Sequence, residues 1–186
     1  TYNCKGGIRI DFCNGLRVLF PEEAEKRHYK LIVVDYDSNI KLFEGVLQSG
    51  DYFVSQKHYF VNFALQITDA ETGEKILQEK FNAKNRNVLI RIPVETLGDT
   101  IAWFSAIERF EKKHQCRIFV KMAEYIRCLF EPEYPSFTFV NEEECKNIFP
   151  YACYTLAIFH DDTEKNESPI DYRQIPLHHV SSYILG

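Results

Sequence analysis

The chain has 186 residues, enough for one ordinary domain or two small ones. Hydrophobic residues make up 45% of it, with 15 Phe and 11 Tyr, so a folded core is expected and a disordered chain is excluded. The formal net charge is -5 and no basic run occurs, which argues against a nucleic-acid partner. No stretch has the length of a transmembrane helix and the first residues lack the features of a secretory signal, so we expect a cytoplasmic protein without membrane insertion.

Six cysteines are scattered through the chain without a CxxC pair. Most lie in apolar patterns such as "CRIFV" and "YIRCLF", where cysteine acts as a small buried hydrophobe. Their even number permits a disulfide set, but reduced thiols explain the pattern more simply. The spacing does not suit a metal site, so no metal or cofactor is expected in this chain.

The alternating apolar residues and frequent turn signals of residues 1–87 are typical of a β-rich domain. The segments "GIRIDF" and "GLRVLF" lie on either side of an Asn-Gly turn signal. "YKLIVVDYDSNIKLFEGVL" predicts two strands around Asp37-Ser38-Asn39, and "HYFVNFALQITDAETGEKILQEKFNA" predicts two more, with Gly73 at the end of their loop. The predicted fold is a small antiparallel barrel or sandwich of about six strands.

Residues 88–186 alternate between strand and helix patterns. Strands are expected in "NVLIRIPV", "CRIFVKM", "SFTFVN" and "YACYTLAIF", and helices in "DTIAWFSAIERFEKKH", "AEYIRCLFEP", "EEECKNIF" and "PLHHVSSYILG". This alternation predicts a parallel sheet with right-handed crossovers, a Rossmann-like α/β lobe. The whole chain is thus predicted to be a two-domain α+β protein.

A glycine and an aspartate, Gly98 and Asp99, mark the junction between the first of these strands and its helix. In open α/β sheets, ligands bind outside the carboxyl ends of the strands, where this junction lies. One interpretation is structural: Asp99 caps the helix, for about 1 kcal/mol, and Gly98 relieves a tight turn. The other is catalytic, because an ionised carboxylate in the first turn suits a general base, and glycine lets a hydroxyl approach the backbone.

Three further residues are candidates for substrate binding. Trp103 lies one helical turn past the aspartate, although core packing is the alternative for a tryptophan in an apolar stripe. Asp161, in "FHDD", follows the fourth strand and either contacts a ligand or begins a solvated loop. His178 lies in the last helix, where its neighbour His179 points about 100° away, so the two cannot form a shared metal pair.

Three segments carry a resemblance to a known family: "GIRIDFCNGLRVLFPE", "VLIRIPVETLGDTIAWFSAIERFEKKHQCRIFVKMAEYIRCLF" and "DYRQIPLHHVSSYILG". Together they resemble the bacterial autotransporter heptosyltransferases, which O-glycosylate adhesins and are similar to lipopolysaccharide heptosyltransferases. The likeness runs along essentially the whole chain, in the same order.

The resemblance implies a glycosyltransferase of the GT-B fold, with two Rossmann-like lobes and an additional β-rich N-terminal domain. Its donor would be ADP-heptose, and its acceptors hydroxyls, mainly of serine, on the passenger domains of autotransporter adhesins. The family's catalytic aspartate corresponds to Asp99 in the motif from Leu97 to Thr100, acting as general base in an inverting transfer. Gly98 and Thr100 of that motif would contact substrate.

Family members are longer than this chain, which therefore resembles their N-terminal portion. The resemblance places the donor-binding lobe and a cysteine-ligated iron site after residue 186, so residues 1–186 alone are expected to be inactive. It also implies homo-oligomers. The alternative is a non-catalytic carbohydrate- or protein-binding module. A dehydrogenase is disfavoured, because the first strand–helix turn lacks GxGxxG.

Overall fold

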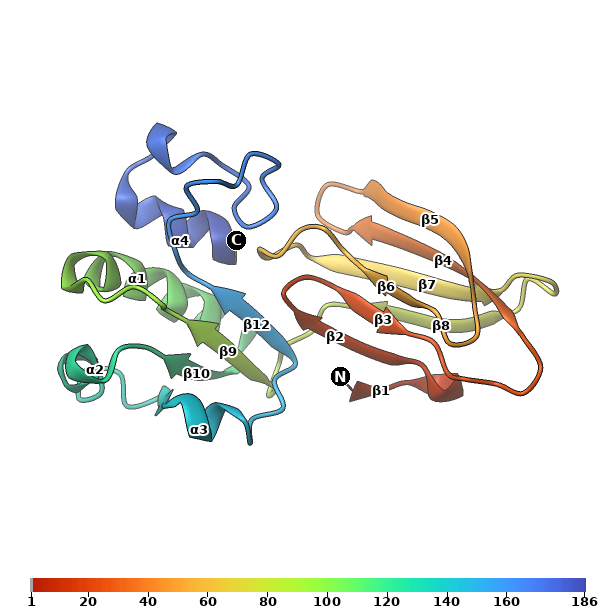
Figure 1. Cartoon of the computed structure of the whole chain (residues 1–186), viewed down its shortest axis with the longest axis horizontal. Helices are drawn as coiled ribbons and strands as arrows, with labels where there is room; N and C mark the ends of the chain where they lie inside the picture. The colour runs from red at the N-terminus through yellow and green to blue at the C-terminus, as the bar shows by residue number, and fades with distance from the viewer. Residues whose placement is uncertain (1) are drawn as a thin grey trace. The chain divides into compact units, whose positions relative to one another are not determined.

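The computed structural model describes residues 2–186, which form two compact units (Figure 1). The first unit contains the chain up to Asp11 together with residues 16–55 and 61–82, and the second contains residues 12–15, 56–60 and 83–186. The single boundary expected after residue 87 is therefore too simple. Two short segments join the second unit, and one of them, residues 12–15, does so because Phe12 and Cys13 pair with a strand of that unit.

The first unit is built from β-strands, most of them in antiparallel hairpins. Their bounds are β1 Tyr2–Asn3, β2 Arg9–Cys13, β3 Arg17–Leu19, β4 His28–Asp35, β5 Ile40–Gln48, β6 Tyr52–Val54, β7 Phe63–Asp69 and β8 Lys75–Lys80, with a short 3-10 helix at Lys5–Gly7. The turn between β2 and β3 has Asn14 at φ 54° and Gly15 at φ 87°. These positive angles are what a two-residue hairpin turn requires, so the Asn-Gly signal correctly predicted this hairpin.

Of the two predicted alternatives, barrel or sandwich, the closed barrel is wrong. Strands β5, β4, β7 and β8 form an open antiparallel sheet in that order, and β3 lies between β2 and β6. Within residues 2–186 no sheet closes on itself, because β5 and β8 remain edge strands. Period-2 alternation fixes which face of a strand is buried, but it does not determine whether the outer strands of a sheet pair with each other.

The core of the four-stranded sheet lies on one face. In β4, Tyr29, Leu31 and Val33 are buried, and in β7, Leu65 and Ile67 are buried opposite them. Cross-strand partners share a face, so these side chains form a continuous apolar layer. Burial of each such side chain stabilises the fold by about 1.5–3 kcal/mol.

The second unit is a parallel sheet with helices on both faces. Its elements are β9 Asn87–Arg91, α1 Leu97–His114, β10 Arg117–Lys121, α2 Glu124–Phe130, β11 Thr138–Val140, α3 Glu142–Cys145, β12 Ala152–Thr155, a 3-10 helix at Tyr172–Gln174 and α4 Leu177–Leu185. The order of strands is β11-β10-β9-β12, and all three pairings are parallel. The predicted alternation of strands and helices thus holds element by element.

Aromatic packing shows which helices cover which face. Phe104 of α1 stacks on Phe130 of α2, with ring centroids 4.0 Å apart, and also faces Phe139 of β11. Helix α3 lies on the opposite face, where Cys145 packs against Leu89 and Cys153 (Figure 1).

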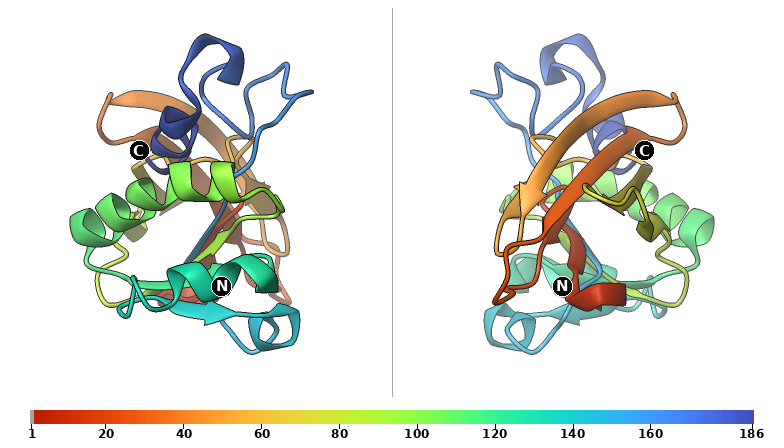
Figure 2. Two further views of the ribbon diagram at one scale, coloured as in Figure 1. Left: turned by 90° about the vertical axis from the view of Figure 1, so that its left-hand side faces the viewer. Right: turned by 90° about the vertical axis from the view of Figure 1, so that its right-hand side faces the viewer.

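Helix α4 lies along α1 (Figure 2). The Arg109 guanidinium donates to the Ser182 hydroxyl at 2.7 Å, and the Lys113 ammonium donates to the carbonyl of Gly186 at 2.8 Å. These bonds between side chains of α1 and the last residues of α4 hold the two helices together on one face of the sheet.

Two expectations about chemistry and targeting can be compared with the structure. Cys116, Cys128 and Cys145 carry free thiols, and burial raises the pKa of Cys116 to about 12. No helix in residues 2–186 combines the length and the apolar character that crossing a membrane requires.

Candidate active site at the carboxyl edge of the parallel strands

The strand order of the second unit creates a switch point. From β9 the chain moves outward to β10 and β11, then returns to place β12 on the other side of β9. The chain leaves β9 into α1 and leaves β12 through a long loop into α4, so the carboxyl ends of these two neighbouring strands are followed by different segments. In open α/β sheets the crevice outside the carboxyl ends of two such strands is where ligands bind.

A cavity of about 340 Å³ lies at this point. It is lined by Arg91, Ile92, Pro93, Glu95, Lys121, Met122, Ala123 and Thr155, which come from the carboxyl ends of β9, β10 and β12 and from the segments that follow β9 and β10. The hydroxyl of Tyr125 in α2 donates to the carbonyl of Glu95 and ties the β9–α1 loop to α2.

Helix α1 begins just past this loop, two residues earlier than its apolar pattern indicates. Its N-cap is Thr96, and Asp99 is the third residue of the helix. The interpretation of Asp99 as the N-cap is therefore wrong. It remains a first-turn carboxylate, where the partial positive charge of the helix N-terminus favours its ionised form.

The Asp99 carboxylate is half-buried and accepts a hydrogen bond from the Thr96 hydroxyl through Oδ2. In the described part of the chain it makes no other hydrogen bond, so Oδ1 is available to an incoming donor. The Thr96 hydroxyl makes no capping bond to the backbone of α1. The one hydroxyl in position to cap the helix thus holds the carboxylate instead.

Gly98 does not serve a tight turn. It lies inside α1 without a positive φ, and a Cβ built there would meet no atom within 4 Å. Neither backbone geometry nor packing in residues 2–186 requires glycine at this position. What the missing side chain provides is open space next to Asp99.

Thr100 and Trp103 are both buried, and for Trp103 this agrees with the core packing given as the alternative to substrate binding. Both are 0% exposed. The Thr100 hydroxyl donates to the Thr96 carbonyl at 2.9 Å, and the Trp103 Nε1–H donates to the Leu177 carbonyl at 3.1 Å. With no exposed surface, these two side chains hold α1 against its own first turn and against α4, and they offer nothing for a substrate to contact.

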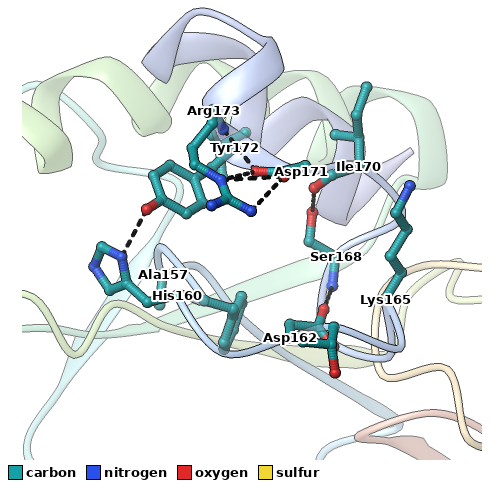
Figure 3. A pocket seen from close by; sticks show the side chains of 12 residues that line it. Ala157, His160, Asp162, Lys165, Ser168, Ile170, Asp171, Tyr172 and Arg173 are labelled. Atoms are coloured by element: carbon teal, nitrogen blue, oxygen red, sulfur yellow. Dashed lines mark hydrogen bonds and ion pairs between the residues drawn. The ribbon is translucent and has the colours of Figure 1, made fainter.

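A second cavity, of about 270 Å³, lies in the loop between β12 and α4 (Figure 3). His160 Nδ1 lies 2.9 Å from the Tyr172 hydroxyl, and Arg173 donates from Nε to Oδ1 and from Nη2 to Oδ2 of Asp171 in a bidentate pair. That pair lowers the pKa of Asp171 to about 2. The cavity thus presents aromatic rings beside the paired charges of Arg173 and Asp171, and the Lys165 side chain also lines it.

The predicted loop residue Asp161 is exposed, whereas its neighbour Asp162 organises the loop. Asp162 accepts hydrogen bonds from the backbone N–H groups of Asn166, Glu167 and Ser168 at 2.7–2.9 Å. Burial alone would raise the pKa of Asp162, but these three donors lower it below its usual value. Asp161 lines a separate, more open hollow on the same loop.

His178 is exposed on α4, with its ring 4.2 Å from that of His179, centroid to centroid. No group of three or more His, Cys, Asp or Glu side chains in residues 2–186 is placed to hold a metal ion. The structure brings neither histidine into contact with Asp99.

Sequence reasoning missed Arg91 and Lys121, which lie at the ends of strands. It also missed the cluster of His160, Tyr172 and Arg173. The sequence could have indicated only Arg91 and Lys121, because charged residues at the carboxyl ends of buried strands are candidates for ligand binding.

Together, the fold and this edge define an α/β unit with a candidate ligand site at the carboxyl ends of its strands and a half-exposed carboxylate in the first turn of α1. Comparisons with known proteins indicate which chemistry such a unit is associated with. A family model described as "Glycosyltransferase TibC, N-terminal domain" matches residues 5–71. The chain is 40% identical to the autotransporter heptosyltransferase BAHTCr of Citrobacter rodentium, over 100% of this chain and 44% of that protein.

A crystal structure of TibC, described as a dodecameric iron-containing heptosyltransferase in complex with ADP-D-beta-D-heptose, superposes with a TM-score of 0.89 at 33% identity. The match covers 100% of this chain and 47% of that one. A protein named as the inactive autotransporter heptosyltransferase BimC, from Burkholderia thailandensis, is 30% identical over 100% of this chain and 42% of its own length. The chain thus spans less than half of these relatives.

The chain is therefore related to the autotransporter heptosyltransferases, which are glycosyltransferases, as its sequence predicted. TibC is described as iron-containing, but the described residues of this chain offer no set of ligands for iron.

Proposed function

We propose that this chain is the acceptor-side part of a GT-B glycosyltransferase that transfers heptose from ADP-heptose to hydroxyls, mainly of serine, on autotransporter adhesins. The parallel unit would be one Rossmann-like lobe of that enzyme. The observation that carries the proposal is the state of Asp99, which is half-exposed in the first turn of α1, beside the open space at Gly98.

In the proposed reaction Asp99 is the general base. It takes the proton of the serine hydroxyl while that oxygen forms a bond to the anomeric carbon of the sugar. The bond between that carbon and the ADP oxygen breaks, ADP leaves with the electron pair, and the configuration at the anomeric carbon inverts. A positioned general base contributes about 10²–10⁴-fold to such a step.

Residues of the same edge support the base. The Thr96 hydroxyl holds Oδ2 of Asp99, leaving Oδ1 for the substrate proton. Gly98 allows the acceptor backbone to approach. The cavity between β12 and α4, with its aromatic rings and polar side chains, suits an acceptor segment next to the reacting hydroxyl.

The test is intact mass spectrometry of an acceptor adhesin produced together with the protein at its full natural length. Replacing Asp99→Ala should abolish the mass increments of added heptose. Glu108→Gln, which removes a half-exposed carboxylate that pairs with Lys112 further along α1, is the matched control and should leave them in place. Undiminished glycosylation by the Asp99 variant would remove the proposed base.

A second candidate function has one observation in its favour. BimC, a relative of similar coverage, is named as inactive. If wild-type protein adds no sugar but still binds the adhesin, the chain would instead belong to a non-catalytic protein-binding module.

A further inference from the structure

Three polar side chains form a row across the switch point. Lys121 of β10 is the register partner of Arg91 of β9, and Arg91 is the register partner of Thr155 of β12. Partners in a parallel sheet point to the same face, so the three side chains lie next to one another on three adjacent strands. All three line the cavity of about 340 Å³ at the carboxyl edge.

The charges in this row are balanced only in part. Lys121 is paired with Glu142 at the start of α3, and that contact lowers the pKa of Glu142. Arg91 makes no ion pair or hydrogen bond from its side chain within residues 2–186, and the Thr155 hydroxyl makes none either. The charge of Arg91 also lowers the pKa of Glu142, so this carboxylate acts on both cations, although only Lys121 pairs with it directly. The guanidinium of Arg91 therefore keeps its hydrogen-bond donors available to an anion in the cavity.

The surroundings favour an anion rather than a neutral ligand. The cavity is partly enclosed by Ile92, Pro93 and Met122, and low-dielectric walls strengthen the attraction between a guanidinium and an anion. Glu95 also lines it, but this side chain is exposed, so solvent screens its charge. Arg91 is half-buried, so part of the cost of removing its charge from water has already been met in folding.

We propose that Arg91, with Lys121 and Thr155, binds a phosphate group of the nucleotide-sugar donor. A guanidinium matches two phosphate oxygens with two parallel N–H donors, and the ammonium and the hydroxyl supply further donors from the flanking strands. Glu142 then acts as the internal anion that Lys121 exchanges for phosphate. This inference rests on the proposed function, because it assigns part of the donor site to the acceptor-side lobe.

The experiment is calorimetric titration of the full-length protein with ADP and, separately, with adenosine. Arg91→Gln should raise the Kd for ADP about tenfold and leave the Kd for adenosine unchanged, since only the phosphates contact the guanidinium. Arg91→Lys should recover part of the loss, because it keeps the charge but not the bidentate geometry.

The matched control is Arg117→Gln. Arg117 is exposed at the amino end of β10, on the same face of the sheet as Arg91. The substitution Arg117→Gln therefore removes an equal charge from the opposite edge of the sheet. Its Kd for ADP should change less than twofold, as expected when only a distant, screened charge is lost. Equal effects of the two variants, or an Arg91→Gln effect on adenosine as large as on ADP, would overturn the proposal.

Thermal unfolding of each variant excludes misfolding as the cause, and Arg91→Lys provides a second reading if Arg91→Gln is unstable. Failure here is separate from failure of the proposed function. If Asp99→Ala abolishes transfer while Arg91→Gln binds ADP normally, only the phosphate site is wrong.

Discussion

The substitution Gly98→Ala adds a single methyl group and should change stability and activity in opposite directions. Gly98 lies in α1 without a positive φ, and an added Cβ would meet nothing within 4 Å. Alanine in place of glycine at such a helical position should stabilise the protein by about 0.5–1 kcal/mol, because it restricts the unfolded chain. That gain corresponds to a rise in Tm of roughly 1–4 °C, measured by thermal unfolding.

The same methyl group would occupy the space through which we expect the acceptor backbone to approach Asp99. Misplacing the reacting groups by about 1 Å costs on the order of 10²-fold in rate, so kcat/KM for transfer should fall at least about tenfold. The assay is transfer of heptose to a purified adhesin by the full-length protein. A stable variant with full activity would refute the role of Gly98 in acceptor approach.

Gly73→Ala is the matched control for the stability half of the prediction. Gly73 also has open space around it, but its φ is 73°, which an L residue adopts only with strain. Alanine there should destabilise the protein by about 1–2 kcal/mol. If both variants were destabilised alike, the helical conformation assigned to Gly98 would be wrong.

Three other predictions concern packing, positioning and pH. Phe104→Ala should cost about 3–5 kcal/mol of unfolding free energy by chemical denaturation, whereas truncating Phe149, which is 85% exposed, should change it by less than about 0.5. Thr96→Val should lower kcat about tenfold at unchanged stability, because the hydroxyl bonds to the carboxylate of Asp99 and not to the helix backbone; Thr96→Ser should restore kcat, and its failure to do so would contradict a positioning role. The pKa of Asp171 is about 2 in the folded protein, below its unfolded value of about 3.9, so its contribution to stability is complete above pH 4 and is lost as pH falls toward 2. The difference in unfolding midpoint between wild type and Asp171→Asn should therefore be present at pH 5 and vanish near pH 2, and a difference that persists at pH 2 would show that it does not arise from ionisation.

Local patterns in the sequence were enough to place most elements of the fold. The Asn-Gly turn between β2 and β3 and the apolar stripe of α1 depend on neighbouring residues alone, and both were predicted correctly. The closed barrel was not, because closure depends on whether β5 and β8 find partners, and no local pattern encodes that.

The site was harder to predict than the fold. Asp99 was found because a carboxylate after a strand is visible in the sequence, but its place as third helical residue depends on where α1 starts. The loop between β12 and α4 has no periodicity, and Lys57 holds it by donating to the carbonyls of Glu164 and Lys165 from 107 and 108 residues away. The row centred on Arg91 required the strand order and the register, which only the folded structure supplies.

The most direct test of the account is the single-turnover rate constant of the full-length protein carrying Asp99→Asn, at saturating ADP-heptose and adhesin. This variant preserves the shape of the side chain and removes only its capacity to accept a proton. We predict a rate constant about 10²–10⁴-fold below wild type, with unchanged affinity for the donor. A rate constant equal to that of wild type would contradict the assignment of Asp99 as the base.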